Sequence, residues 1–347
     1  MGSSDQEKSE QVTSAVSAHF DVYGYEFTIE SDSPEPARSL ASDFEFFSIA
    51  GPPKHRPVTI RIRNADPDYD QLPPLCANVY TPRNASYRDG DLTYADYHGR
   101  GLGIHNRLTG DFEIVTRSAD LQYEACYLFL LAQLGETLDR RQLHRVHALG
   151  ISINNRAALV LLPMGGGKST LGSHLLADPA VKLLSDDSPF IDRRGSVHGF
   201  PTRIGLLPGS EETVPREFRR TIQRMEFGPK ILVDFRYFAD RAIGGAEPAF
   251  VFLGSRSLAR TCEIIPASYW DGVRTMGENC VIGMGLFQGL EFFLQKSTRQ
   301  LVGQAAIAWS RLRASQRLLA RSNVLHLRLG RDSQENARAV LAYMRSH

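Results

Sequence analysis

Six consecutive residues have the types and the order that bind a phosphate group. They are Gly165, Gly166, Gly167, Lys168, Ser169 and Thr170. Glycines allow backbone N–H groups to approach anionic oxygens, and the N-terminus of a following helix adds the positive end of its dipole. In such a loop the lysine reaches the β- and γ-phosphates of a nucleotide, and the serine hydroxyl coordinates Mg²⁺. The segment therefore predicts a site for ATP or GTP together with Mg²⁺.

The segments on both sides of these glycines favour the same interpretation. Residues 157–162 form an apolar run typical of a buried strand, and residues 170–176 have a helical pattern. Leu162 stands where the usual phosphate-loop pattern has its first glycine. The alternative is a glycine-rich turn that binds no ligand, but the order of strand, glycines, lysine, hydroxyl and helix argues against it.

Two adjacent carboxylates, Asp186 and Asp187, follow a second short apolar run over residues 181–185. In an α/β sheet the carboxyl ends of strands and the phosphate loop open at the same edge, so both carboxylates are expected near the γ-phosphate. One of them would hold Mg²⁺ together with Ser169, and the other would accept the proton of an attacking hydroxyl. The alternative is an Asp-Asp turn that caps the next strand.

Other polar residues are candidates for positions near the transferred phosphate. His147 precedes the strand of the glycine segment, and Arg203 follows the acidic pair. A cation at Arg203 would neutralise charge in the transition state of phosphoryl transfer. Lys230 ends a charged tract over residues 208–230, expected to be a mobile lid or a surface helical hairpin, and is a candidate lid cation; Arg256 is a weaker one. The structural alternatives are an internal hydrogen bond for His147 and a surface ion pair for Arg203.

The composition limits the classes of function. The chain has 347 residues, with 40 Lys and Arg against 39 Asp and Glu, a balance that argues against a general nucleic-acid or membrane-surface binder. No apolar run approaches the roughly 18 residues of a membrane span, and no signal peptide is recognised. The four cysteines are widely separated, which favours buried, reduced thiols. We expect a cytoplasmic protein that binds neither nucleic acid nor membrane.

Basic residues gather late in the chain, at Arg311, Arg313, Arg317 and Arg321. A solvated helix face is the simpler explanation, and a face that meets an anionic ligand is the alternative.

One arrangement of residues resembles a known family. His147, the run over residues 165–171 and the run over residues 184–187 occur in the order found in the HPr kinase/phosphorylase superfamily. They look most like the divergent HPr kinase-related proteins, which share their core with ATP-dependent phosphoenolpyruvate carboxykinases. The clear resemblance spans residues 140–205. It implies a P-loop kinase that moves the γ-phosphate of a nucleoside triphosphate to a hydroxyl, commonly a serine of a protein or peptide.

The resemblance also implies roles for matching positions. The glycines, Lys168 and Ser169 match the phosphate loop of the family. Asp186 and Asp187 match its acidic pair. His147 matches a histidine placed near the transferred phosphate. Thr170 stands where HPr kinases have a glutamate, as on the carboxykinase side of the superfamily. HPr kinases assemble into oligomers, so a homo-oligomer is possible. The candidate catalytic residues are Lys168, Asp186, Asp187, His147 and Arg203.

The chain is expected to have three parts. Residues 1–18 are polar and form a disordered lead-in. Residues 19–140 form a smaller β-rich domain, which would bind the acceptor or a partner. Residues 141–347 alternate strand-like and helical runs, as in a nucleotide-binding core. The fold class is therefore α/β, with a P-loop core of HPr kinase/carboxykinase type after a β-rich domain.

The leading hypothesis is an ATP-dependent kinase that phosphorylates a Ser/Thr-type hydroxyl of a peptide, protein or small metabolite. Two alternatives remain. One is a non-catalytic, ATP-binding regulatory or scaffolding protein, and the other is an enzyme of phosphoryl transfer on a small carboxylate.

Overall fold

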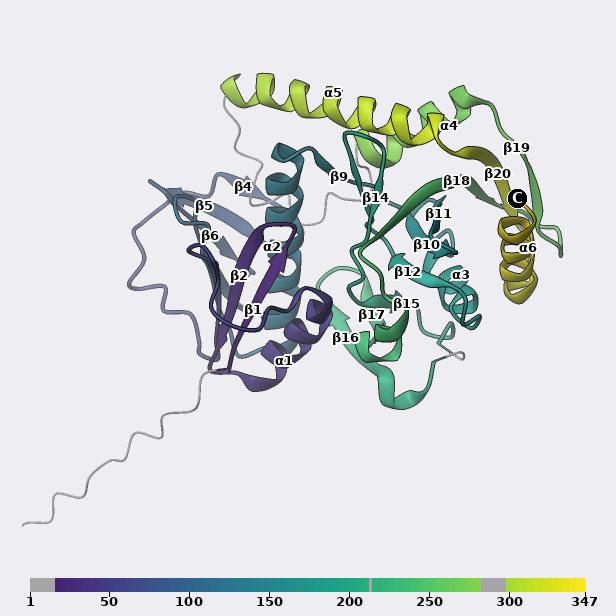
Figure 1. Ribbon diagram of the computed structural model, residues 1–347. Coiled ribbons are helices and arrows are strands. Elements are labelled where there is room, and N and C mark those ends of the chain that lie inside the picture. The colour runs from purple at the N-terminus through teal and green to yellow at the C-terminus, as the bar shows by residue number, and fades with distance from the viewer. Residues whose placement is uncertain (1–15, 212–213, 282–297) are drawn as a thin grey trace, which may run out of the picture.

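The computed structural model describes residues 16–211, 214–281 and 298–347. These residues form a mixed α/β protein with three sheets, and the sheet of the β-rich N-terminal region is smaller than the central one (Figure 1). The longer helices are α1 (Pro34–Asp43), α2 (Ala119–Arg140), α3 (Lys168–Leu175), α4 (Tyr269–Met276), α5 (Thr298–Ala320) and α6 (Ser333–Ser346). Among the described residues, no helix is long and apolar enough to cross a membrane.

The N-terminal sheet has eight strands in the order β1-β2-β3-β8-β7-β6-β5-β4. Their bounds are β1 Val16–Val22, β2 Tyr25–Ser31, β3 Val58–Arg63, β4 Val79–Tyr80, β5 Ala85–Asp89, β6 Leu92–Asp96, β7 Leu102–Asn106 and β8 Phe112–Val115. Strand β1 begins within residues 1–18, which were expected to be a disordered lead-in. It is ordered because it forms a hairpin with β2 that packs Phe20 against Phe27. Residues 1–15 lie outside the described residues.

The central sheet has nine strands, and its middle carries the glycine segment. Seven follow the order β12-β10-β11-β18-β14-β13-β9, while β20 pairs with β18 and β19. The bounds are β9 Leu143–Arg145, β10 Leu149–Ile153, β11 Arg156–Leu161, β12 Lys182–Ser185, β13 Phe190–Asp192, β14 Val197–His198, β18 Gly245–Arg256, β19 Glu263–Pro266 and β20 Asn323–Leu329. Strands β11, β18 and β20 run parallel to one another.

The central sheet is buried on both faces because alternate residues of β11 enter different cores. Ala158 and Val160 pack with Leu171 and Leu175 of α3 and with residues of α6. Leu159 and the other residues of the opposite face pack beneath α4 and α5. A strand buried on both faces has a continuous run of apolar residues, and this run is why the strand could be predicted from the sequence.

The charged tract over residues 208–230 is not a helical hairpin. Its described part contains β16 (Arg219–Arg224) and β17 (Gly228–Val233), which form a third sheet with β15 (Ile204–Leu206). In β16 only Ile222 is buried. Most of its side chains are charged or polar and not buried, so the sequence showed no strand pattern there.

The core of the N-terminal region also takes residues from later in the chain. Phe190 and Phe200 pack with Phe44 and Phe47 of the N-terminal region. Leu232 of β17 belongs to the same apolar cluster. The β-rich region and the central sheet therefore share packed side chains.

Candidate functional site

The glycine loop (residues 163–167) connects β11 to α3. Gly165 and Gly167 have φ values of 73° and 99°, a left-handed conformation that favours glycine. Gly167 is the N-cap of α3, and the first helical bond runs from Leu171 N–H to the Gly167 carbonyl at 2.9 Å. The N–H groups of residues 168–170 therefore precede the helical ladder, as in an anion-binding helix N-terminus.

The remaining residues of the loop help to shape this turn. Gly166 is buried, and its N–H donates to the Pro163 carbonyl at 2.9 Å. Gly165 is exposed and has open space beside it. The Thr170 carbonyl accepts a hydrogen bond from Ser173 Oγ at 2.9 Å, which ties the first turn of α3 together. Arg256, at the end of β18, places a guanidinium nitrogen 3.4 Å from where a Cβ on Gly167 would lie.

Lys168 is buried at the start of α3, and its ammonium group is directed into the loop. Its Nζ donates to the Leu162 carbonyl at 2.6 Å and lies 2.9 Å from His147 Nε2. The Asp187 carboxylate is 3.9 Å away. Burial lowers the pKa of Lys168, opposed by the charges of Asp187 and Asp186. Keeping a poorly solvated ammonium group at this loop therefore lowers the stability of the folded state.

The sheet brings Asp186 and Asp187 to the glycine loop. Strands β11 and β12 both run antiparallel to β10, so they run in the same direction and end at the same edge. Ser169 Oγ donates to Asp186 Oδ2 at 2.9 Å, and the Gly205 N–H donates to the same oxygen at 3.2 Å. The other carboxylate oxygen of Asp186 is buried and has no hydrogen-bond partner among the described residues.

Asp187 has different surroundings from Asp186, although the two are adjacent. Its side chain is 52% exposed, and its Oδ1 lies 3.1 Å from His147 Nδ1. With Lys168 donating to Nε2, the proton of a neutral His147 ring resides on Nδ1, facing this carboxylate. The His147 ring therefore lies between Lys168 and Asp187, although its Nδ1 makes no regular hydrogen bond among the described residues.

The two carboxyl groups have pKa values displaced in opposite directions. Burial, reinforced by the charge of Asp187, raises the pKa of Asp186 from 3.8 to about 6. Desolvation also acts to raise the pKa of Asp187, but His147 and the charges of Lys168 and Lys230 outweigh it and leave the value below the ordinary one. Neighbouring carboxyl groups with separated pKa values suit different chemical roles.

Lys230 on β17 brings a second ammonium group to the acidic pair. A Cβ on Gly205 would overlap Cε and Nζ of Lys230, so the lysine fills the space that this glycine leaves open. Burial lowers the pKa of Lys230, as does Arg203, whereas Asp186 and Asp187 act to raise it. The sequence indicated Lys230 as a lid cation, but gave no sign that Gly205 accommodates its side chain.

The guanidinium group of Arg203 is held by aromatic side chains of α2. It donates to Tyr123 Oη and stacks 3.6 Å from the centre of the Tyr127 ring. Arg220 donates to both Tyr123 Oη, at 2.8 Å, and the buried Asp43, at 2.6 Å. This cluster joins α1 and α2 to the third sheet, which is a structural task for Arg203. The cluster was missed in the sequence because its members are far apart in the chain.

The residues around the acidic pair fit a Mg²⁺ ion that arrives with a nucleotide. No group of three or more His, Cys, Asp or Glu side chains suited to a metal occurs among the described residues. Mg²⁺ usually takes only one or two protein carboxylates and completes its shell with phosphate oxygens and water. The unpartnered Asp186 oxygen and the Ser169 hydroxyl beside it are ligands of that kind.

No protein-family model matches the chain, and no curated protein matches it. The functional assignment therefore depends on the residues of the site and on their geometry.

Proposed function

We propose that this protein is a Mg²⁺-dependent kinase of the HPr kinase-related type, which transfers the γ-phosphate of ATP or GTP to a hydroxyl group. One observation carries the proposal: Lys168 and Ser169 at the start of α3, and Asp186 and Asp187 just after β12, converge on one glycine loop. A turn that only connected a strand to a helix would not need a buried ammonium group and two carboxylates at its mouth.

The residues divide the chemistry among themselves. The N–H groups at the start of α3 and the ammonium group of Lys168 bind the β- and γ-phosphates. Asp186 and Ser169 would hold the Mg²⁺, which neutralises phosphate charge when bound. The half-exposed Asp187 orients the acceptor hydroxyl. The acceptor oxygen forms a bond to the γ-phosphorus, the bond to the β-phosphate oxygen breaks, the nucleoside diphosphate leaves, and Asp187 takes the proton.

A transfer assay tests the proposal. The purified protein, with γ-labelled ATP and a cell extract as the source of acceptors, should transfer label to a hydroxyl with Mg²⁺ and lose all transfer with EDTA. Label in an acid-stable, alkali-labile ester supports a Ser/Thr-type acceptor. Tight nucleotide binding without transfer would favour the non-catalytic ATP-binding protein instead. Nucleotide-dependent loss of CO₂ from a small carboxylate would favour the carboxykinase-like alternative.

We expect the second lysine of the site to support transfer rather than nucleotide binding. Replacing Lys230 with methionine should lower kcat by about a hundredfold, since a preorganised cation beside the transferred group contributes to the transition state. The nucleotide dissociation constant should change by less than about threefold, because Lys168 and the loop N–H groups remain. A matched control is Lys54→Met, which removes a lysine from the exposed surface.

Gly205→Ala provides a second test of Lys230. The new Cβ would displace the end of the Lys230 side chain without removing its charge. The variant should therefore reproduce much of the kcat loss of Lys230→Met while folding normally. Unchanged kcat in both variants would mean that Lys230 only balances the charge of the acidic pair.

A further inference from the structure

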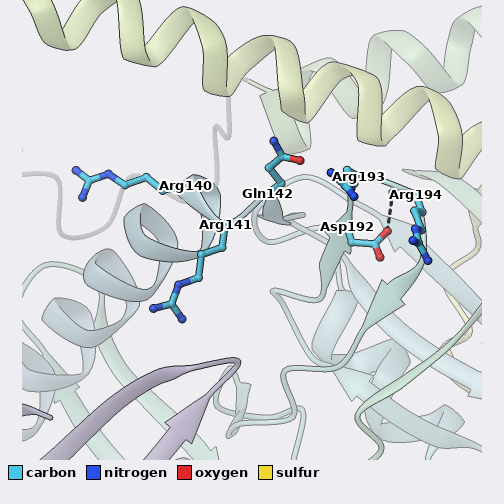
Figure 2. Close-up of a pocket in the computed structure, with 6 residues that line it drawn as sticks. All are labelled: Arg140, Arg141, Gln142, Asp192, Arg193 and Arg194. Carbon is cyan, nitrogen blue, oxygen red and sulfur yellow. Dashed lines mark hydrogen bonds between the residues drawn. The ribbon is translucent and has the colours of Figure 1, made fainter. Parts of the chain in front are cut away.

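An open pocket lined by arginines lies beside the carboxyl end of α2 (Figure 2). Its volume is about 490 Å³. The lining residues come from the end of α2 and from the turn between β13 and β14, and they are Arg140, Arg141, Gln142, Asp192, Arg193 and Arg194. We call this the arginine pocket. It is separate from the glycine loop and the acidic pair.

The turn that carries Arg193 and Arg194 is held in place by α5. Arg317 donates to the Arg193 carbonyl, and Arg321 donates to the Arg194 carbonyl at 3.2 Å. These two cations, one near the end of α5 and one just after it, thus fix the turn. The late basic residues of the sequence therefore do more than form a solvated helix face.

Glu136 pairs with Arg140 of the pocket, but no carboxylate is paired with the arginines of the turn among the described residues. Asp192 Oδ1 accepts the N–H groups of Arg194 and Ser196, at 2.8 and 3.0 Å, so this carboxylate caps its own turn. The side chains of Arg193 and Arg194 are exposed and have no carboxylate partner among the described residues. In a chain with 40 basic and 39 acidic side chains, such a local excess of like charge favours an anionic partner.

The shape of the pocket distinguishes between anions. In Figure 2 Arg140 and Arg141 point away from the turn that carries Arg193 and Arg194, so the labelled arginines do not point at a common centre. A single phosphate needs converging donors, whereas spread guanidinium groups suit several carboxylates along a chain. Among the described residues that line the pocket there is no aromatic side chain on which a nucleic-acid base would stack.

Two paired strands lead from the pocket to the acidic pair. Strand β9 begins after Gln142 and leads to His147, and β13 leads back from Asp192 towards Asp187; the two strands pair antiparallel. The five steps from Asp187 to Asp192 span at most about 16 Å, because only the last three of these residues belong to β13 and the rise of an extended strand sets the limit. An extended peptide whose hydroxyl lies at Asp187 can span this distance with about five residues.

We propose that the arginine pocket docks an acidic segment of the acceptor, and that the acceptor is therefore a protein or peptide. Its carboxylates would lie about five residues from the phosphorylated hydroxyl. The identification of the bound segment as part of the phosphate acceptor rests on the proposed kinase function. The binding of an acidic segment does not depend on it. The pocket would steer the acceptor and fix its register, while the glycine loop holds the nucleotide.

A binding assay without nucleotide tests the docking. The full-length protein should bind a fluorescein-labelled hexaglutamate peptide and release it as NaCl rises from 50 to 300 mM, since exposed charges are screened. The double variant Arg193→Gln/Arg194→Gln should bind about tenfold more weakly, because each lost guanidinium–carboxylate pair contributes modestly. A matched control, Arg38→Gln/Arg338→Gln, removes the same charge from exposed positions of α1 and α6.

Two further binding measurements distinguish an acidic peptide from other anions. Inorganic phosphate at equal charge should compete poorly, and an oligo-dT of similar charge should bind more weakly than the peptide. Equal peptide binding by both double variants, or tighter binding of oligo-dT, would overturn the proposal. Since no nucleotide is present, loss of γ-phosphate transfer in another assay leaves this result unaffected and would count only against the kinase function.

Discussion

Replacing Lys168 with methionine is expected to lower the rate of γ-phosphate transfer by about a thousandfold or more, the effect of removing a preorganised charge from a desolvated phosphoryl-transfer site. The Nζ atom lies at the mouth of the glycine loop, within 3.9 Å of Asp187. When a triphosphate binds, this ammonium group is the one best placed to follow the charge that develops on the γ-phosphate. The effect should appear mainly in kcat.

The Lys168→Met variant should nonetheless fold at least as stably as the original chain. Burial lowers the pKa of Lys168, so the folded state holds the charged form at a cost at neutral pH. This cost falls as the pH rises and the lysine loses its proton. Removing the charge removes the cost, although the hydrogen bond to the Leu162 carbonyl is also lost. A melting temperature equal to or above that of the unmodified protein would separate lost catalysis from lost structure.

Lys182→Met is the matched control for this prediction. Lys182 is on β12 of the same sheet, and its Nζ donates to the Asp240 carbonyl at an exposed position, 3.2 Å away. The control should transfer phosphate normally. If Lys168→Met transferred phosphate as fast as the control, the glycine loop would not be a catalytic phosphate site, and the proposed kinase function would fail.

The sequence predicted the glycine loop and its flanking elements because their signals are local. The apolar run over residues 157–162 corresponds to β11, shifted by one residue, and the residues after the glycines begin α3. The meeting of Asp186 with Ser169 was also predicted, on the expectation that the carboxyl ends of strands and the phosphate loop open at the same edge of the sheet. Strand β10 in fact lies between β11 and β12 and is antiparallel to both.

Strand β10 had a signal in the sequence that was not used. Asn154 and Asn155 both have positive φ, 52° and 62°, and connect β10 to β11 as a tight hairpin. Asparagine tolerates this conformation better than most residues, so adjacent asparagines before a strand indicate a hairpin. Because the strands on both sides of β10 still run in one direction, the conclusion about the acidic pair survived this omission.

The surroundings of Arg203 could not be predicted from the sequence. Its partners Tyr123 and Tyr127 lie on α2, and Asp43 ends α1. Each of these positions has an ordinary helical role when taken alone. Their meeting depends on the packing of two helices against the third sheet, and one strand of that sheet, β16, has the composition of a surface loop. Local patterns contain no information about such contacts.

Asp186→Asn should have opposite effects on stability and on activity. Burial raises the pKa of Asp186 to about 6, against 3.8 for the unfolded chain. A raised carboxyl pKa contributes stability that is fully present below pH 3.8 and is lost as the pH rises through 6, because the folded state then holds a poorly solvated charge. Asparagine carries no charge at any of these pH values and keeps the shape of the side chain.

In EDTA at pH 8, the Asp186→Asn variant should therefore unfold at a higher urea concentration than the original protein. The gain in unfolding free energy is up to about 3 kcal/mol, from two pH units of displacement. This gain in unfolding free energy should decrease as the pH falls from 6 to 4 and should be absent below pH 4. With Mg²⁺ and ATP the order should reverse, because the original protein gains stability from the bound metal–nucleotide complex, whereas the variant lacks a metal ligand and transfers no phosphate.

Asp187→Asn is the matched comparison, and its effect on stability should have the opposite sign. The pKa of Asp187 is below its ordinary value, so this carboxylate adds stability above the unfolded pKa and loses it on acidification through the folded value. The Asp187 variant should therefore be less stable than the original protein at pH 8, by a small amount since the side chain is half-exposed. Equal stability changes in the two variants would mean that the aspartates share one environment, and the separate metal-binding and hydroxyl-orienting roles would have no structural basis.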